Sequence, residues 1–191
     1  PPQAPPDEQD VLIEADCIAQ ALQQLGYTTD LFPVSLDLSA LHARLSRQPP
    51  YQIFNLVESL AGRGAYIVLP MLVYSEFDIA YTGAPSHAMW QSSNKLLSKR
   101  LLARHGLPTA PWTLAETERS QHAYIVKSVW EHASLGIDDN SVLEAGQVAQ
   151  ALAQRRSSGG AWFAERYIEG REFNVGLLQN ASGIEILPIT E

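Results

Sequence analysis

Hydrophobic residues in the first part of the chain alternate between a helical spacing and short strand-like runs. From Asp7 to Leu25 the apolar residues recur every three or four positions, as on one face of an amphipathic helix, and Gly26 ends the pattern. Short apolar runs predict strands at residues 27–32, 52–56 and 78–81. Two more helices are predicted, at residues 39–47 with Ser39 as the N-cap and at residues 65–77. This alternation indicates an α/β unit with a parallel sheet and helices on its faces.

The second part of the chain follows a segment that is rich in glycine and proline. An amphipathic helix is predicted over residues 94–105, and residues 106–113 then supply two prolines and a glycine, which is typical of a hinge. Beyond the hinge, the pattern predicts strands at residues 123–129, 162–166, 172–178 and 183–188, and a helix at residues 144–155. The last two strands are expected to form a hairpin around residues 180–182. These elements indicate an α+β lobe.

Composition excludes several classes of protein. The chain has 191 residues and a net charge of −8 without a basic stripe, so nucleic acid is not expected as a partner. No apolar run reaches the length of a transmembrane helix, so no membrane partner is expected either. The single cysteine, Cys17, cannot form an internal disulfide and is compatible with a reducing cytoplasm, which is the expected location.

Two lysines lie at positions where their positive charge is expected to bind an anion. Lys127 lies within the β-branched run 124–129, and a lysine inside a buried strand needs either an anionic partner or an end that is open to water. Lys95 begins the amphipathic helix at residues 94–105. For both residues the alternative is structural, because a lysine can extend along the surface to reach solvent.

The segment from Glu165 to Glu172 is the most informative feature of the chain. It places two carboxylates around an apolar, aromatic-containing stretch, with Gly170 shortly before the second. A flat heterocycle can lie against such a stretch, and an acid one turn later can accept hydrogen bonds from sugar hydroxyls. The arrangement outlines an adenine–ribose site. The alternative is a charged hairpin that joins two ordinary strands.

Taken together in this order, these features resemble the ATP-grasp superfamily, close to the D-alanine–D-alanine ligase group. The matching stretches are residues 54–58, 81–84, 94–99, 106–112, 125–136, 165–173 and 187–188. The resemblance implies a pre-ATP-grasp substrate domain over residues 1–92 and part of an ATP-grasp domain over residues 93–191. The strand that the family places before the first helix is missing, so the chain is expected to be truncated at both ends.

The resemblance implies an enzyme, a carboxylate–amine ligase that uses ATP and Mg²⁺ and forms an acyl phosphate. Lys95 and Lys127 match the two lysines that bind ATP phosphates, Glu165 the acid that accepts from the adenine amino group, and Glu172 the ribose-binding acid. Tyr167 and Ile168 match the residues that flank adenine. The resemblance implies ATP and a small amino-acid or dipeptide-like substrate as partners, and it allows a homodimer.

The loop at residues 130–136 matches the family's loop that folds over the phosphates, but it departs from the pattern. Ser134 and Gly136 remain, and Ser134 is assigned a catalytic role with Lys127, while His132 and Ala133 stand where glycine and serine are usual. Glu131 and His132 are therefore candidates for substrate contacts, although an exposed loop histidine is the alternative for His132.

A second departure lies after the strand predicted at residues 52–56. Glu58 stands where D-alanine ligases have a histidine–glycine pair, and the end of a parallel strand is where α/β proteins place ligand-contacting groups. Our hypothesis is that Glu58 binds an amino group of a substrate other than D-alanine. The alternative is a charge at the start of the following loop or helix.

The acids and asparagine that hold Mg²⁺ in ATP-grasp ligases have no match in the last strands, so the metal ligands are expected outside this chain. Two further functions remain open beside the ligase: a non-catalytic nucleotide- or ligand-binding module derived from the fold, and a glutathione-synthetase-like ligase with another substrate pair.

Overall fold

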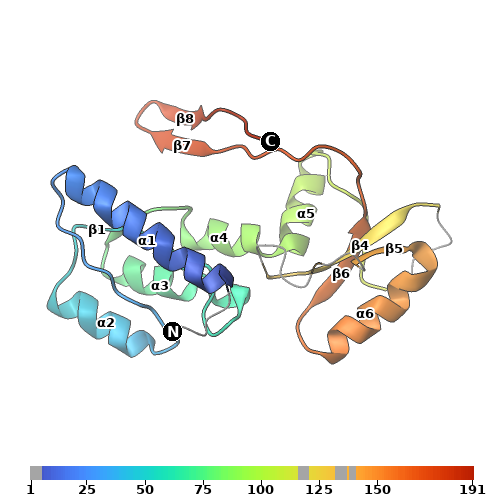
Figure 1. Ribbon diagram of the computed structural model, residues 1–191, viewed down its shortest axis with the longest axis horizontal. Coiled ribbons are helices and arrows are strands. Elements are labelled where there is room, and N and C mark those ends of the chain that lie inside the picture. The colour runs from blue at the N-terminus through green and yellow to red at the C-terminus, as the bar shows by residue number, and fades with distance from the viewer. Residues whose placement is uncertain (1–5, 116–120, 132–136, 138–140) are drawn as a thin grey trace. The chain divides into compact units, whose positions relative to one another are not determined.

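The computed structural model describes residues 6–115, 121–131, 137 and 141–191 (Figure 1). They form two compact units, each with its own core. The first unit takes in the described residues up to Thr109 together with Ser128 to Glu131. The second takes in Ala110 to Lys127, where described, and the described residues from Ile137 to Glu191. The two units are described separately below.

Helices dominate the first unit, and its sheet is small. The helices are α1 (Pro6–Gln24), α2 (Leu38–Arg47), the 3-10 turn η1 (Gly64–Tyr66), α3 (Leu69–Glu76), α4 (Ser86–Ser93) and α5 (Lys95–Arg104). The strands β1 (Gln52–Ile53) and β2 (Ala80–Tyr81) pair in parallel, with Gln52 opposite Ala80 and Ile53 opposite Tyr81. A parallel pair in this unit was expected, but α4 was not.

The core of the first unit lies between α2, α3 and β2. Leu41 and Leu45 of α2 pack against Met71 and Tyr74 of α3 and against Ile79, and all five side chains are buried. Ile53, Phe77, Tyr81 and Met89 pack around this cluster. Burial raises the pKa of the Tyr74 hydroxyl to about 12. Ile53, the last residue of β1, packs against this cluster, and the chain continues from there toward Glu58.

Three predicted strands of the first unit need correction. Residues 27–32 form no strand: Tyr27 and Leu31 are exposed, and no neighbouring strand pairs with this segment among the described residues. The predicted strand 52–56 ends at Ile53, because the N–H of Asn55 donates to Thr82 Oγ1 at 2.9 Å instead of to a strand. The predicted strand 78–81 is likewise only β2, two residues long.

Two further corrections concern helix starts. Asp37, not Ser39, caps α2, since the Asp37 carboxylate accepts from the N–H of Ala40. The pKa of Asp37 is lowered by the Ser39 hydroxyl, which donates to it, and by the same N–H. The predicted helix 65–77 is divided into η1 and α3, and Pro70 near the start of α3 has no N–H to continue a helix from η1.

The second unit contains a four-stranded sheet covered by one helix. Its elements are β3 (Trp112–Thr113), β4 (Ala123–Ser128), β5 (Val142–Glu144), the 3-10 turn η3 (Ala145–Gln147), α6 (Val148–Ser157) and β6 (Trp162–Arg166). The strand order is β3-β6-β4-β5, and both edge pairs are antiparallel. Val126 and Ala164 of the sheet pack with Val148 and Leu152 of α6. The predicted strands 123–129 and 162–166 and the helix 144–155 are confirmed, with small differences at their ends.

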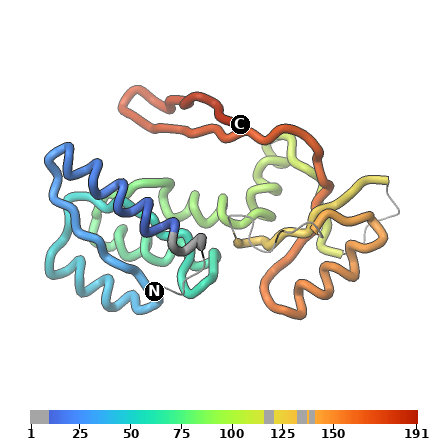
Figure 2. Tube along the Cα trace, in the orientation of Figure 1, coloured from blue at the N-terminus to red at the C-terminus, as the bar shows by residue number. Residues whose placement is uncertain are grey.

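The chain ends in a two-stranded hairpin, which Figure 2 traces as an extended arm. Strands β7 (Leu177–Asn180) and β8 (Gly183–Ile186) pair in antiparallel fashion, so the predicted hairpin around residues 180–182 is confirmed. The first strand begins later than the predicted start at residue 172, and the second ends before residue 188. Residues 174 and 190 form an isolated bridge at the base of the arm. No helix in the described part of the chain combines the length and the apolar character needed to cross a membrane.

Candidate functional site

Two predicted site residues of the second unit are in direct contact. Lys127 Nζ lies 2.8 Å from Glu165 Oε1, and the two residues come from β4 and β6, which are neighbours in the sheet. The Lys127 side chain is 29% exposed and the Glu165 side chain 13% exposed. The pair is therefore partly withdrawn from water but still reachable, which strengthens its electrostatic attraction relative to an ion pair on an open surface.

Strand alternation explains why these two side chains meet. Val126 and Ala164 point to the face that α6 covers, and both are buried in that core. Lys127 and Glu165 are the next residues along their strands, so their side chains project from the opposite face. The apolar pattern that makes β4 and β6 strands thus also places a cation and an anion together on the face away from the helix.

Two backbone hydrogen bonds hold the segment directly after Glu165 where it continues from the end of β6. The N–H of Arg166 donates to Pro111 O, and the N–H of Tyr167 donates to Ala123 O, both at 2.9 Å. Tyr167 and Ile168 are both exposed, with Ile168 at 62%. The chain therefore presents an aromatic and an aliphatic side chain to solvent shortly after the strand that carries Glu165.

Glu172 is exposed and lies at the base of the hairpin arm. Its neighbour Arg171 forms a two-point ion pair with Glu191, at 2.5 and 2.6 Å, and its guanidinium lies 4.7 Å from the centre of the Phe173 ring. The hydrogen bonds between Arg171 and Glu191 raise the pKa of Arg171 and lower the pKa of Glu191. This pair was not predicted, since 20 positions of sequence separate its members.

Lys95, which belongs to the first unit, forms hydrogen bonds through both its backbone N–H and its side-chain ammonium group. Asn94 caps α5 by accepting from the N–H of Leu97 at 3.0 Å, and Lys95 is the first residue of that helix. The N–H of Lys95 donates to Val129 O at 3.0 Å, and its Nζ donates to Glu131 O. The helix start and the segment 129–131 are therefore fastened to each other.

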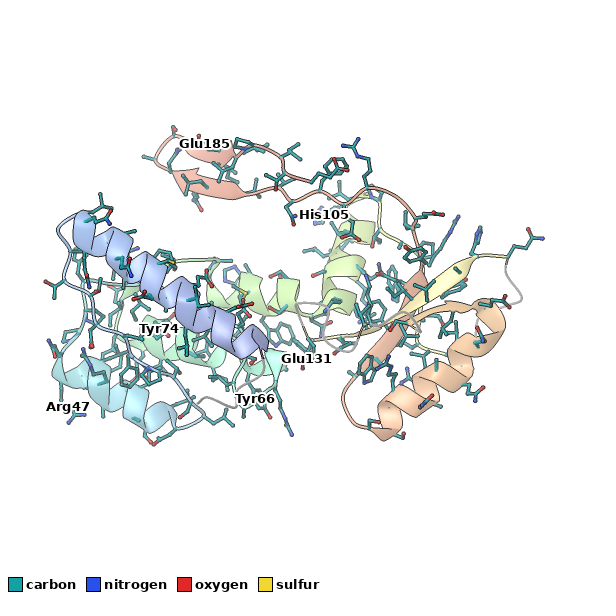
Figure 3. All side chains as sticks on the ribbon, in the orientation of Figure 1. Arg47, Tyr66, Tyr74, His105, Glu131 and Glu185 are labelled. Atoms are coloured by element: carbon teal, nitrogen blue, oxygen red, sulfur yellow. The ribbon has the colours of Figure 1, made fainter. Side chains whose placement is uncertain are left out.

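The Glu131 carboxylate is directed at a turn of the first unit (Figure 3). Its two oxygens accept from the N–H of Gly64, at 3.2 and 3.4 Å. A Cβ on Gly64 would lie 2.4 Å from the backbone oxygen of Trp130, so only glycine fits there. Sequence reasoning did not single out Gly64, and its place in a glycine-containing turn gave no sign of a partner 67 positions away.

Glu58 lines a cavity of about 300 Å³ in the first unit. The other lining residues are Ile67, Met89, Ser92 and Ser93. Three of them belong to α4, the helix that the sequence did not predict, so the cavity could not be foreseen either. Glu58 is exposed, whereas Ile67 and Ser93 are buried.

The predicted site residues are distributed over both units, and two of them cannot be placed. His132 and Ser134 lie outside the described residues. Lys95, Glu131 and Glu58 belong to the first unit, and Lys127, Glu165, Tyr167, Ile168 and Glu172 belong to the second. Across the described ranges, no three histidine, cysteine, aspartate or glutamate side chains gather in a way that could hold a metal ion. The described side chains therefore do not fit a magnesium centre, which needs several hard oxygen ligands.

Comparison with known proteins places these residues in a wider context. No protein-family model matches the chain. The protein y4sG of Sinorhizobium fredii, itself uncharacterized, is 28% identical in an alignment of 189 residues that covers 93% of this chain and 55% of y4sG. The D-alanine–D-alanine ligase of Methylococcus capsulatus is 30% identical over 172 residues, covering 85% of this chain and 52% of that ligase. The chain thus spans about half the length of the curated relatives it matches.

A solved structure gives the corresponding result for the fold. The D-alanine–D-alanine ligase of Bacillus anthracis matches with a TM-score of 0.70 at 16% identity, covering 97% of this chain and 60% of that one. The chain therefore shares the mixed α/β fold of that ligase. The resemblance seen in the sequence is confirmed: over most of its length this chain is similar in sequence to D-alanine–D-alanine ligases, and it shares the fold of one of them.

Proposed function

We propose that this chain supplies the nucleotide site of an ATP-dependent carboxylate–amine ligase. In the proposed reaction, a substrate carboxylate attacks the γ-phosphorus of ATP and ADP leaves, giving an acyl phosphate. The nitrogen of an amine then attacks the acyl carbon. A C–N bond forms, the C–O bond to phosphate breaks, and the amine loses a proton. The similarity to D-alanine–D-alanine ligases supports this reaction class.

The observation that carries the proposal is the contact between Lys127 and Glu165 at 2.8 Å. One side chain can donate to a phosphate oxygen and the other can accept from the neutral amino group of adenine, so the pair offers the donor and the acceptor that these two groups of a nucleotide need. Without ligand, the two charges neutralise each other, which avoids an unpaired charge in a partly buried position. In the proposal, ATP provides each of them with a new partner.

The segment that follows Glu165 is proposed to hold the adenine ring. Ring faces favour apolar and aromatic surfaces, and Tyr167 and Ile168 expose both kinds there. The N–H groups of Arg166 and Tyr167 already donate within the sheet. The main chain at Ile168 is therefore the part of the segment that we assign to reading the ring edge.

Glu172 is proposed to accept from the ribose hydroxyls. Its carboxylate is exposed and follows Glu165 by seven positions (172 − 165). The Arg171–Glu191 ion pair and the bridge between residues 174 and 190 close the base of the arm beside it. These contacts restrict the backbone at Glu172, so a carboxylate there is held with less loss of entropy on binding.

Lys95 is proposed as the second phosphate lysine, and Ser134 as a catalytic residue of the phosphate-covering loop with Lys127. Phosphoryl transfer depends chiefly on positioning and on neutralising negative charge, which suits these roles. For Glu131 we propose a positioning role, because its carboxylate already accepts from Gly64 and its carbonyl already accepts from Lys95. His132 stays a candidate for substrate contact.

Formation of ADP tests the proposed reaction class. In the whole protein with ATP and Mg²⁺, addition of an amino-acid substrate is expected to stimulate ADP release and to form an amide product. Lys127→Ala is expected to reduce that rate, while Arg47→Ala, an exposed change in the first unit, should leave it unchanged. ATP binding with no ADP formation across a panel of amino acids would favour a non-catalytic nucleotide-binding module instead.

A further inference from the structure

The Glu58 cavity has the size of a site for a small molecule. Its volume of about 300 Å³ is at the low end of the range for ligand pockets, which suits an amino acid or a dipeptide better than a nucleotide. It is built from three separate places in the chain: the segment after β1, the residue Ile67 between η1 and α3, and α4.

The charge of the cavity selects for a cation. Glu58 is the one charged residue among the described residues that line it, and none of these carries a positive charge. A divalent metal ion is a poor fit, because no cluster of three ligating side chains exists in the described parts of the chain and a single carboxylate seldom holds such an ion. An organic ammonium group needs fewer charged ligands.

The hydrogen-bonding groups of the cavity match an ammonium group in number. An ammonium carries three donors and no acceptor. Glu58 provides a carboxylate, and Ser92 and Ser93 each provide a hydroxyl oxygen. The Ser92 hydroxyl already donates to Met89 O at 3.2 Å, so its oxygen has lone pairs left to accept with. Ile67 and Met89 add apolar wall against which a short aliphatic side chain can pack.

We propose that this cavity binds the ammonium group of a small amine or amino acid, with Glu58 as its counter-charge. Any carboxylate of the same ligand lies outside the cavity, since its described lining offers no cation. Ser92 and Ser93 directly precede Asn94 and Lys95 at the junction of α4 and α5. The cavity and the proposed phosphate lysine therefore share one helix junction. The binding of an ammonium group follows from the chemistry of the cavity alone. The further step, that the ligand is the amine-bearing substrate of the ligase, rests on the proposed function.

Titration with matched probes tests the proposal. Alaninamide carries an ammonium group and no carboxylate, and N-acetylalanine carries the carboxylate and no ammonium group. We expect alaninamide to shift the backbone amide resonances of Ser92, Ser93 and Ile67 in this chain with saturation, and N-acetylalanine to leave them in place. Glu58→Gln should weaken alaninamide binding about tenfold, as for loss of a charge-assisted hydrogen bond. Glu76→Gln, an exposed carboxylate of α3, is the control and should bind normally.

Each outcome decides the matter. No saturable shift with alaninamide, equal binding of N-acetylalanine, or unchanged affinity in Glu58→Gln would contradict the ammonium site. Because Glu58 is exposed, the variant is expected to fold, and its thermal unfolding checks this. ATP affinity measured on the same samples should be unchanged in Glu58→Gln. Failure of the unaltered chain to bind ATP would count against the proposed nucleotide site and leave the alaninamide result standing.

Discussion

Lys127 and Glu165 lie 2.8 Å apart on neighbouring strands, on the sheet face opposite α6. Both side chains are mostly withdrawn from water, and each limits the cost of burying the other. The pair is thus a structural element of the second unit as well as the proposed centre of its nucleotide site. These two roles have different experimental consequences.

A double-mutant cycle measures the structural role. Removal of either partner leaves the other charge partly buried, so Lys127→Met and Glu165→Gln should each destabilise the chain by about 1–2 kcal/mol, between the values for exposed and for fully buried ion pairs. The double variant should lose less than the sum. Urea unfolding provides the free energies, and a coupling energy of zero would mean that the contact does not form in solution.

Gly64→Ala tests how the segment around Glu131 is fastened. The added methyl group would lie 2.4 Å from the Trp130 backbone oxygen, and a backbone atom cannot move aside cheaply. We expect a loss of about 1–3 kcal/mol in the free energy of unfolding. Gly146→Ala is the matched control, since nothing lies within 4 Å of its added methyl group. Equal stability of the two variants would show that Trp130 does not approach Gly64 as described.

Titration of Glu191 tests the ion pair at the base of the hairpin arm. Hydrogen bonds from Arg171 lower the pKa of Glu191 below its ordinary value of 4.5. A carboxylate whose pKa is depressed by folding stabilises the folded chain above the unfolded-state value, and that contribution is lost as the pH falls through the folded-state pKa.

The carboxyl carbon resonance of Glu191 should therefore titrate below pH 4.5, and Arg171→Ala should return the midpoint toward that value. Arg100→Ala, which removes an exposed arginine of α5, is the control and should leave the midpoint where it is. An identical midpoint with and without Arg171 would show that the arm's base is open in solution.

Two strands of the four-stranded sheet, β4 and β6, could be predicted because their patterns are local, whereas β3 and β5 were not predicted. The runs 123–129 and 162–166 are rich in apolar and aromatic residues, and both pack against a helix whose own period could be recognised in the sequence. The run 27–32 was also predicted as a strand but forms none, because a strand needs a neighbour with which to pair, and none pairs with it among the described residues. A local sequence pattern indicates which residues favour a strand, but it does not show whether a second strand lies beside them to form hydrogen bonds.

The contacts of the candidate site likewise divide into those that local sequence patterns indicate and those that depend on distant parts of the chain. The residue types at Lys127 and Glu165 marked them as candidates, and strand alternation accounts for their common face. The approach of Gly64 to Glu131 and the cavity around Glu58 arise from segments far apart in the chain, including α4, whose apolar pattern was too weak to predict. The predicted N-cap of α2 was also wrong: Ser39 is a residue type that favours the N-cap, but Asp37 occupies that position.

ATP affinity is the most direct test of the proposal that residues 165–172 and Lys127 form one nucleotide site. By calorimetry, Lys127→Ala and Glu172→Ala should each weaken ATP binding about tenfold or more, as expected for loss of a charged hydrogen-bonding group. Glu169→Ala, which removes an exposed carboxylate from the same segment, should bind ATP as the unaltered chain does. Unchanged affinity in both Lys127→Ala and Glu172→Ala would contradict the account.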